Sequence, residues 1–148
     1  PMYTTDGIYW TAEVELEVTE SVMINDTKRI IHRLEKLRDM GFKISIDDFG
    51  TGFSSLSYLK DMPANTLKID KSFLDTLIED PSTQVITENM ICLSKKLNLV
   101  SIAEGVETEQ QFAYIRRMGV DVIQGYLFSK PIPKPEMEKL IQQEGFDL

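Results

Sequence analysis

The chain of 148 residues has the length of one ordinary domain, and its 42% hydrophobic content is enough to build a core. Its formal net charge of −8, without a block of lysine and arginine, argues against broad DNA or RNA binding. The single cysteine, Cys92, excludes an intrachain disulfide, and no apolar run approaches the ~20 residues of a membrane span. We therefore expect a cytoplasmic domain, although its parent protein could be tethered to a membrane.

The pattern of apolar residues predicts strands that alternate with helices. Residues 1–12 show no clear period, and we treat them as an atypical N-terminal segment before a main unit of residues 13–148. The predicted strands are 13–18, 43–47, 66–69, 99–103 and 120–123. The predicted helices are 22–40, 54–60, 72–78, 83–97, 108–118 and 135–141. This alternation predicts an α/β fold with a parallel sheet and right-handed crossovers.

The stretch Ile44–Leu56 combines a buried strand with two adjacent carboxylates and a small-residue loop. Asp47 and Asp48 come where the predicted strand ends. Carboxylates at such a position indicate a divalent metal site, and glycines and hydroxyls allow close approach to a phosphate. An alternative is a turn whose aspartates cap the next helix. The loop residues concerned are Gly50, Thr51, Gly52, Ser54 and Ser55.

Each of the five predicted strands ends in a polar residue. These residues are Glu17, Asp47 with Asp48, Lys68 with Asp70, Glu104, and Gln124. Because the carboxyl ends of parallel strands lie at one edge of the sheet, we expect these side chains to form a site. The four carboxylates Glu17, Asp47, Asp48 and Glu104 suit Mg²⁺ or Mn²⁺.

The remaining polar residues have more than one interpretation. Lys68 could act as a general base, or it could hold a water or a phosphate by its charge. Gln124 could orient a water, and Glu20 and Glu107 could brace the glycine loop or cap a helix. Two enzyme chemistries fit this set: two-metal hydrolysis of a phosphodiester, and proton abstraction by lysine beside a metal-bound carboxylate substrate.

Five motifs in order resemble the EAL domain family of bacterial signal-transduction proteins. They are LEVTES (16–21), DDFGTGFSSL (47–56), LKIDKSF (67–73), AEGVET (103–108) and QGYLFSKPI (124–132). The resemblance implies a phosphodiesterase that opens cyclic di-GMP to linear pGpG, on a (β/α)₈ TIM-barrel-type fold. It also implies two Mg²⁺ or Mn²⁺ ions held with the help of Glu17, Asp47, Asp48 and Glu104.

The resemblance assigns roles to the other site residues as well. Lys68 would assist the attacking water, and Gln124 would lie beside the ions. Glu20 would hold the loop 48–55, which in the family links metal binding to the dimer interface. Glu107 would be a supporting residue.

Only the C-terminal portion of such a domain is matched, with about five strand–helix units in residues 13–148. The Glu-Ala-Leu strand that names the family, and the following asparagine strand, have no counterpart. We therefore expect this chain to be weakly active or inactive alone, within a parent that carries further regulatory domains. The alternatives are a non-catalytic cyclic di-GMP-binding module and a self-associating module.

An incomplete barrel also predicts self-association. We expect the face that carries Val14, Leu16, Ile44, Ile46, Leu67, Ile69, Ile102 and Ile123 to lack opposing strands. Exposure of so large an apolar surface is unfavourable. The sequence therefore predicts a homodimer that buries this face.

Overall fold

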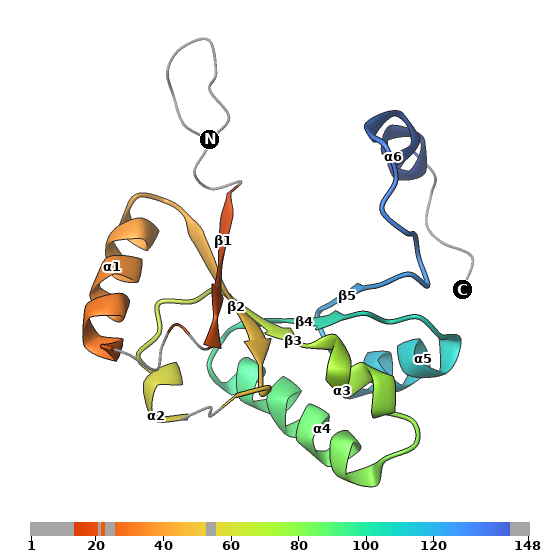
Figure 1. Cartoon of the computed structure of the whole chain (residues 1–148), viewed down its shortest axis with the longest axis horizontal. Coiled ribbons are helices and arrows are strands. Elements are labelled where there is room, and N and C mark those ends of the chain that lie inside the picture. The colour runs from red at the N-terminus through yellow and green to blue at the C-terminus, as the bar shows by residue number, and fades with distance from the viewer. Residues whose placement is uncertain (1–13, 21, 23–25, 53–55, 143–148) are drawn as a thin grey trace.

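A computed structural model describes residues 14–20, 22, 26–52 and 56–142. In this part of the chain five parallel strands form one sheet in the sequential order β1-β2-β3-β4-β5 (Figure 1). The strands are β1 (Glu15–Thr19), β2 (Lys43–Phe49), β3 (Thr66–Ile69), β4 (Val100–Glu104) and β5 (Val122–Gln124). The predicted parallel α/β architecture is confirmed.

Six helices connect and follow these strands in the described residues. They are α1 (Thr27–Asp39), α2 (Leu56–Leu59), α3 (Lys71–Thr76), α4 (Pro81–Lys96), α5 (Glu109–Met118) and α6 (Lys134–Ile141). Their bounds differ from the predicted ones by up to five residues, and the largest difference is at the start of α1. No helix among the described residues is long and apolar enough to cross a membrane.

Helices α1 to α5 cover one face of the sheet and form the core with it. Ile44, Ile46, Leu67 and Ile69 are fully buried. They join a cluster with helix residues Leu34, Leu74, Leu77, Ile91 and Ile115. In Figure 1, α1 and α2 lie beside β1 and β2, whereas α6 stands apart from the other helices.

The structure contradicts the prediction of which face of the sheet is open. Ile44, Ile46, Leu67 and Ile69 are covered by helices of the same chain, so they do not form an open apolar face. The prediction was wrong because crossover helices of a parallel sheet pack against its most apolar face. Side chains alternate along a strand, so the opposite face carries the positions between them. That face includes Ser45, Thr66, Lys68, Ile102, Val100 and Val122, the last two each 44% exposed.

A capping box at the start of α5 also ties this helix to its neighbour. Thr108 Oγ1 accepts a hydrogen bond from Gln111 N, and Gln111 Oε1 accepts from the backbone N–H groups of Glu107 and Thr108. The Gln111 side chain also donates from Nε2 to the carbonyl oxygen of Leu74 at 2.8 Å. Gly119 ends the helix with a φ of 76°, in the left-handed conformation.

We expect Gln111→Ala to lower the free energy of unfolding by roughly 2 kcal/mol, because it removes the hydrogen bonds of the Gln111 side chain to the Leu74 carbonyl and to two backbone N–H groups. Urea titration followed by circular dichroism measures this loss. The neighbouring Gln110 is exposed, and Gln110→Ala should change stability by no more than about 0.5 kcal/mol. Equal stabilities for the two variants would contradict the assigned role.

Candidate metal and catalytic site

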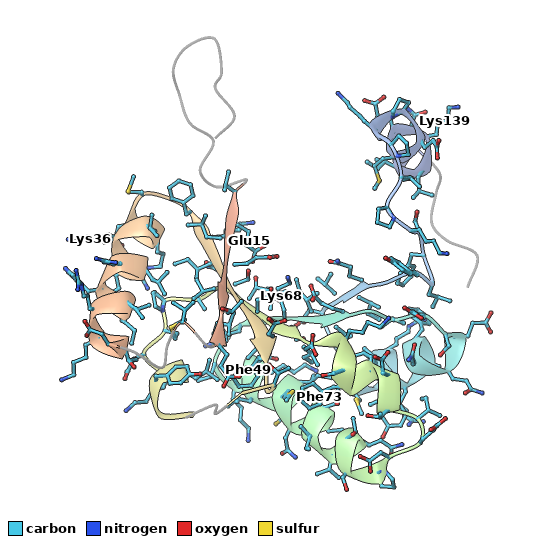
Figure 2. The ribbon with its side chains drawn as sticks, in the orientation of Figure 1. Glu15, Lys36, Phe49, Lys68, Phe73 and Lys139 are labelled. Atoms are coloured by element: carbon cyan, nitrogen blue, oxygen red, sulfur yellow. The ribbon has the colours of Figure 1, made fainter. Side chains whose placement is uncertain are left out.

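Three predicted acidic residues converge on the ammonium group of Lys68 at the strand ends. Lys68 Nζ lies 2.7 Å from Glu17 Oε1 and 2.8 Å from Glu104 Oε1. It lies 3.0 Å from Asp47 Oδ1. Figure 2 places Lys68 near the middle of the sheet. Residues from four consecutive strands, β1 to β4, are thus brought together as the sequence predicted.

A β-bulge explains how two adjacent aspartates reach this cluster. Ile46 pairs with Leu67, and Phe49 pairs with Ile69, so Asp47 and Asp48 together lie opposite Lys68. In a regular strand adjacent side chains point to opposite faces, but a bulge breaks this alternation. Asp48 has a φ of 54°, a left-handed conformation that few non-glycine residues adopt. The strand therefore continues through both aspartates, and its predicted end at residue 47 was wrong.

The pKa of Asp48 is shifted by burial and by the charges around it. Burial, followed by the charges of Asp47 and Asp70, raises the pKa of the Asp48 carboxyl. The charge of Lys68 acts in the opposite direction. Asp48 therefore belongs electrostatically to the same crowded set of carboxylates, which a cation stabilises.

Lys68 supplies the positive charge that this set requires. Its side chain is only 10% exposed. Burial alone lowers the pKa of Lys68, but the carboxylates of Glu104, Glu17 and Asp47 outweigh burial and raise it. Lys68 is accordingly protonated at neutral pH in this arrangement. The three carboxylates near its ammonium group favour the charged form of Lys68, and its catalytic role stays a prediction.

Glu20 lies beneath the glycine loop. It is 4% exposed, and its Oε2 accepts a hydrogen bond of 3.0 Å from the backbone N–H of Gly50. A Cβ atom on Gly52 would lie 3.0 Å from Oε1 of the same glutamate. Thr51 Oγ1 donates to the carbonyl oxygen of Asp48. Glu20 thus contacts the loop that it is predicted to hold, while Ser54 and Ser55 lie outside the described residues.

Gly50 leaves no room for a side chain. Its φ is 93°, and a Cβ atom there would lie 2.2 Å from Cε of Met90 and 3.0 Å from the ring of Phe73. The loop therefore packs against both α3 and α4. This close contact, rather than an approach to phosphate, is the constraint that the structure places on Gly50.

Gln124 and Glu107 border an open cleft of ≈ 790 Å³ beside the carboxylate cluster. Gln124 pairs in register with Glu104 and is exposed. Glu107 forms an ion pair with Lys71 at the rim of the cleft. Lys71 lies within the LKIDKSF motif (67–73), but it was not singled out as a site residue from the sequence. Its position at the start of a helix beside Asp70 was the signal available.

The donor groups fit a divalent cation in their chemistry. Glu17, Asp47, Asp48 and Glu104 offer hard oxygen ligands, which Mg²⁺ and Mn²⁺ prefer. Oδ1 of Asp47 is buried and accepts no well-aligned hydrogen bond, so it keeps a lone pair for a further cation. No group of three or more acidic, histidine or cysteine side chains among the described residues forms a ready-made metal cluster. The carboxylates instead surround Lys68, with which a metal ion would compete.

The comparisons with known proteins agree with this geometry. The family model for the EAL domain matches residues 5–131 of this chain. The chain belongs to the EAL domain family. It is 42% identical over 134 residues to the cyclic di-GMP phosphodiesterase NbdA of Pseudomonas aeruginosa, covering 90% of this chain but 17% of NbdA.

Solved EAL structures share the fold of this chain. The complex of PaMucR phosphodiesterase with c-di-GMP has a TM-score of 0.82 and 44% identity, over 86% of this chain and 51% of that one. A manganese and cyclic di-GMP complex of BlrP1 from Klebsiella pneumoniae has a TM-score of 0.76 and 32% identity, over 82% and 31%. The five-stranded sheet is thus an incomplete version of the TIM-barrel-type EAL fold, and the chain spans about half of the PaMucR chain.

We expect Lys68→Met to lower the free energy of unfolding by about 2 kcal/mol at neutral pH, because it leaves three neighbouring carboxylates without their cation. The partial exposure of Glu17 keeps the loss below that of a fully buried ion pair. Urea titration measures it.

Lys71→Met is the matched control, because it removes a lysine whose ion pair is exposed. Its effect should stay within about 1 kcal/mol. A Lys68→Met variant as stable as the control would contradict the central position assigned to Lys68.

Proposed function

We propose that this chain is the C-terminal portion of a phosphodiesterase domain that hydrolyses cyclic di-GMP to linear pGpG. One observation carries the proposal: the polar ends of four consecutive EAL-type strands converge on Lys68 in the described residues. The names of the relatives support the substrate, since NbdA is a cyclic di-GMP phosphodiesterase and PaMucR was solved with c-di-GMP.

The carboxylates would hold the metal ions of this reaction. We assign Glu17, Asp47, Asp48 and Glu104 as ligands for Mg²⁺ or Mn²⁺, with two ions in a complete domain. The BlrP1 complex with manganese supports the use of a divalent ion. When bound, such ions polarise the phosphate and lower the pKa of a bound water.

The other residues of this chain would position the substrate and the water. The ammonium group of Lys68 would stabilise negative charge that develops on the phosphate. Gln124 would orient the water or the substrate through its amide. Glu20 would hold the loop at Gly50, and the loop in turn fixes the backbone next to Asp48.

A binding or self-associating module is the second candidate. Among the described residues β1 and β5 are the edge strands of the sheet, each with one neighbouring strand, and Val100 and Val122 are each 44% exposed on its open face. These features favour association with a second copy, as in a homodimer. We place the parent protein in the cytoplasm or on its membrane, with further regulatory domains, since the chain spans only 17% of NbdA.

Asp47→Asn should weaken Mn²⁺ binding by at least about tenfold, because a neutral amide replaces a charged ligand. Isothermal titration of the purified chain with Mn²⁺ measures this change. The control is Asp61→Asn, which neutralises an exposed aspartate in a turn after α2. Unchanged Mn²⁺ affinity in the Asp47 variant would count against this ligand assignment.

The isolated 148-residue chain should show little or no phosphodiesterase activity. Its site is open at the rim, with the Glu17 side chain 57% exposed, and Val100 and Val122 on the same face of the sheet are each 44% exposed. Release of pGpG from cyclic di-GMP with Mg²⁺ or Mn²⁺, followed by chromatography, is the measurement. Robust turnover by the chain alone would show that these strands suffice.

A further inference from the structure

Helix α1 concentrates positive charge in an acidic protein. It carries Lys28, Arg29, Arg33, Lys36 and Arg38 against Glu35 and Asp39, a net charge of +3 in a chain whose total is −8. Four of these cations and His32 recur at intervals of three to four residues. We call this set, Lys28, Arg29, His32, Arg33 and Lys36, the basic stripe.

The basic stripe faces away from the core. All five of its side chains are exposed. The apolar face of the helix, with Ile30, Ile31, Leu34 and Leu37, packs against the core cluster. Figure 2 shows Lys36 on the outer side of α1. Because α1 lies on the helix-covered face, the basic stripe is separated from the Lys68 cluster by the sheet.

The arrangement of these charges is unfavourable for the helix itself. Like charges four residues apart destabilise a helix, and Arg29 and Arg33 form such a pair. Lys28 and Arg29 lie in the first turn, where the helix dipole disfavours cations and where α1 has no acidic residue. The N-cap residue Asp26 makes no side-chain capping hydrogen bond.

Helices α4 and α5 carry their cations only in the last turn, whereas α3 and α6, like α1, have a cation in the first turn. Lys95 and Lys96 lie in the last turn of α4, and Arg116 and Arg117 lie in the last turn of α5. Those positions complement the helix dipole. The charges of α4 and α5 are therefore explained by helix stability, whereas those at the start of α1 are not.

Partners among the described residues do not offset the repulsion. His32 approaches Glu35 at 3.6 Å, which is the one ion-pair contact of the basic stripe in the described residues. Lys28, Arg29, Arg33 and Lys36 make no ion pair with any carboxylate in that part of the chain. Helix charges that disfavour the helix, and that no ion pair among the described residues offsets, are typical of surfaces that bind a partner.

We propose that the basic stripe is a docking surface for a short acidic segment of another protein. From Lys28 to Lys36 the stripe is ~12 Å long, enough for two to three turns of an acidic helix or a short extended peptide. An extended polyanion, such as duplex DNA or an anionic membrane, would also meet the acidic remainder of the chain, which would repel it. A short acidic segment contacts the stripe alone. This proposal does not depend on the proposed enzymatic function.

Fluorescence anisotropy with a labelled polyglutamate peptide of about ten residues tests the proposal. The whole chain should bind this peptide at about 0.05 M salt and more weakly at about 0.2 M salt, as screening requires. The double variant Arg29→Gln/Arg33→Gln should bind about five- to tenfold more weakly, since it removes two exposed ion pairs.

The control variant Lys60→Gln/Lys96→Gln changes the net charge equally at two exposed lysines outside α1. It should bind within about twofold of the unaltered chain. Urea titration of all variants excludes misfolding as a cause. If the first double variant proved unstable, Lys28→Gln/Lys36→Gln would replace it.

Three results would overturn the proposal. The first is an absence of peptide binding by the unaltered chain. The second is an equal loss in stripe and control variants, which would show an effect of net charge alone. The third is tighter binding to a duplex DNA of about 20 base pairs, or to vesicles with about a quarter phosphatidylserine, than to the peptide.

Discussion

The site depends on the ion pairs between the ammonium group of Lys68 and three carboxylates. Carboxylates crowded at the ends of neighbouring strands repel one another, and the energy of that repulsion grows as water is excluded. A single cation within 3.0 Å of Glu17, Asp47 and Glu104 offsets the repulsion. A divalent ion held by these carboxylates, as we propose, would be stabilised by the same crowding that Lys68 relieves, so folding and metal binding would depend on one set of charges.

The site was more predictable than the details that build it. Polar residues follow the strands in successive strand–helix units, and we could predict that they lie close together because parallel strands end at a common edge. The bulge at Asp47 and Asp48 was not predictable, since a two-to-one pairing leaves no signature in the apolar pattern. Glu20 had two interpretations from sequence, and only the contact with Gly50 distinguishes loop support from capping.

Parallel pairing followed from the alternation of elements, but the side of the sheet did not. Ile44 and Ile46 are apolar enough to face a barrel interior or a helix layer, and periodicity cannot distinguish those environments. Lys68 held the missing information, because it must share a face with the carboxylates that it pairs. Helix termini were most accurate where capping chemistry was explicit, as at Thr108 and Gly119, and least accurate at the start of α1.

The sequential strand order has a consequence for how the chain folds. Each strand pairs only with the strand before it and the strand after it, so no strand must insert between two others that have already paired. Every pairing closes a loop of only a few tens of residues, and such closures are entropically inexpensive. A nucleus around β2 and β3 can therefore grow outward in both directions. A sheet of this order can also gain strands at the β1 edge without breaking any existing pair.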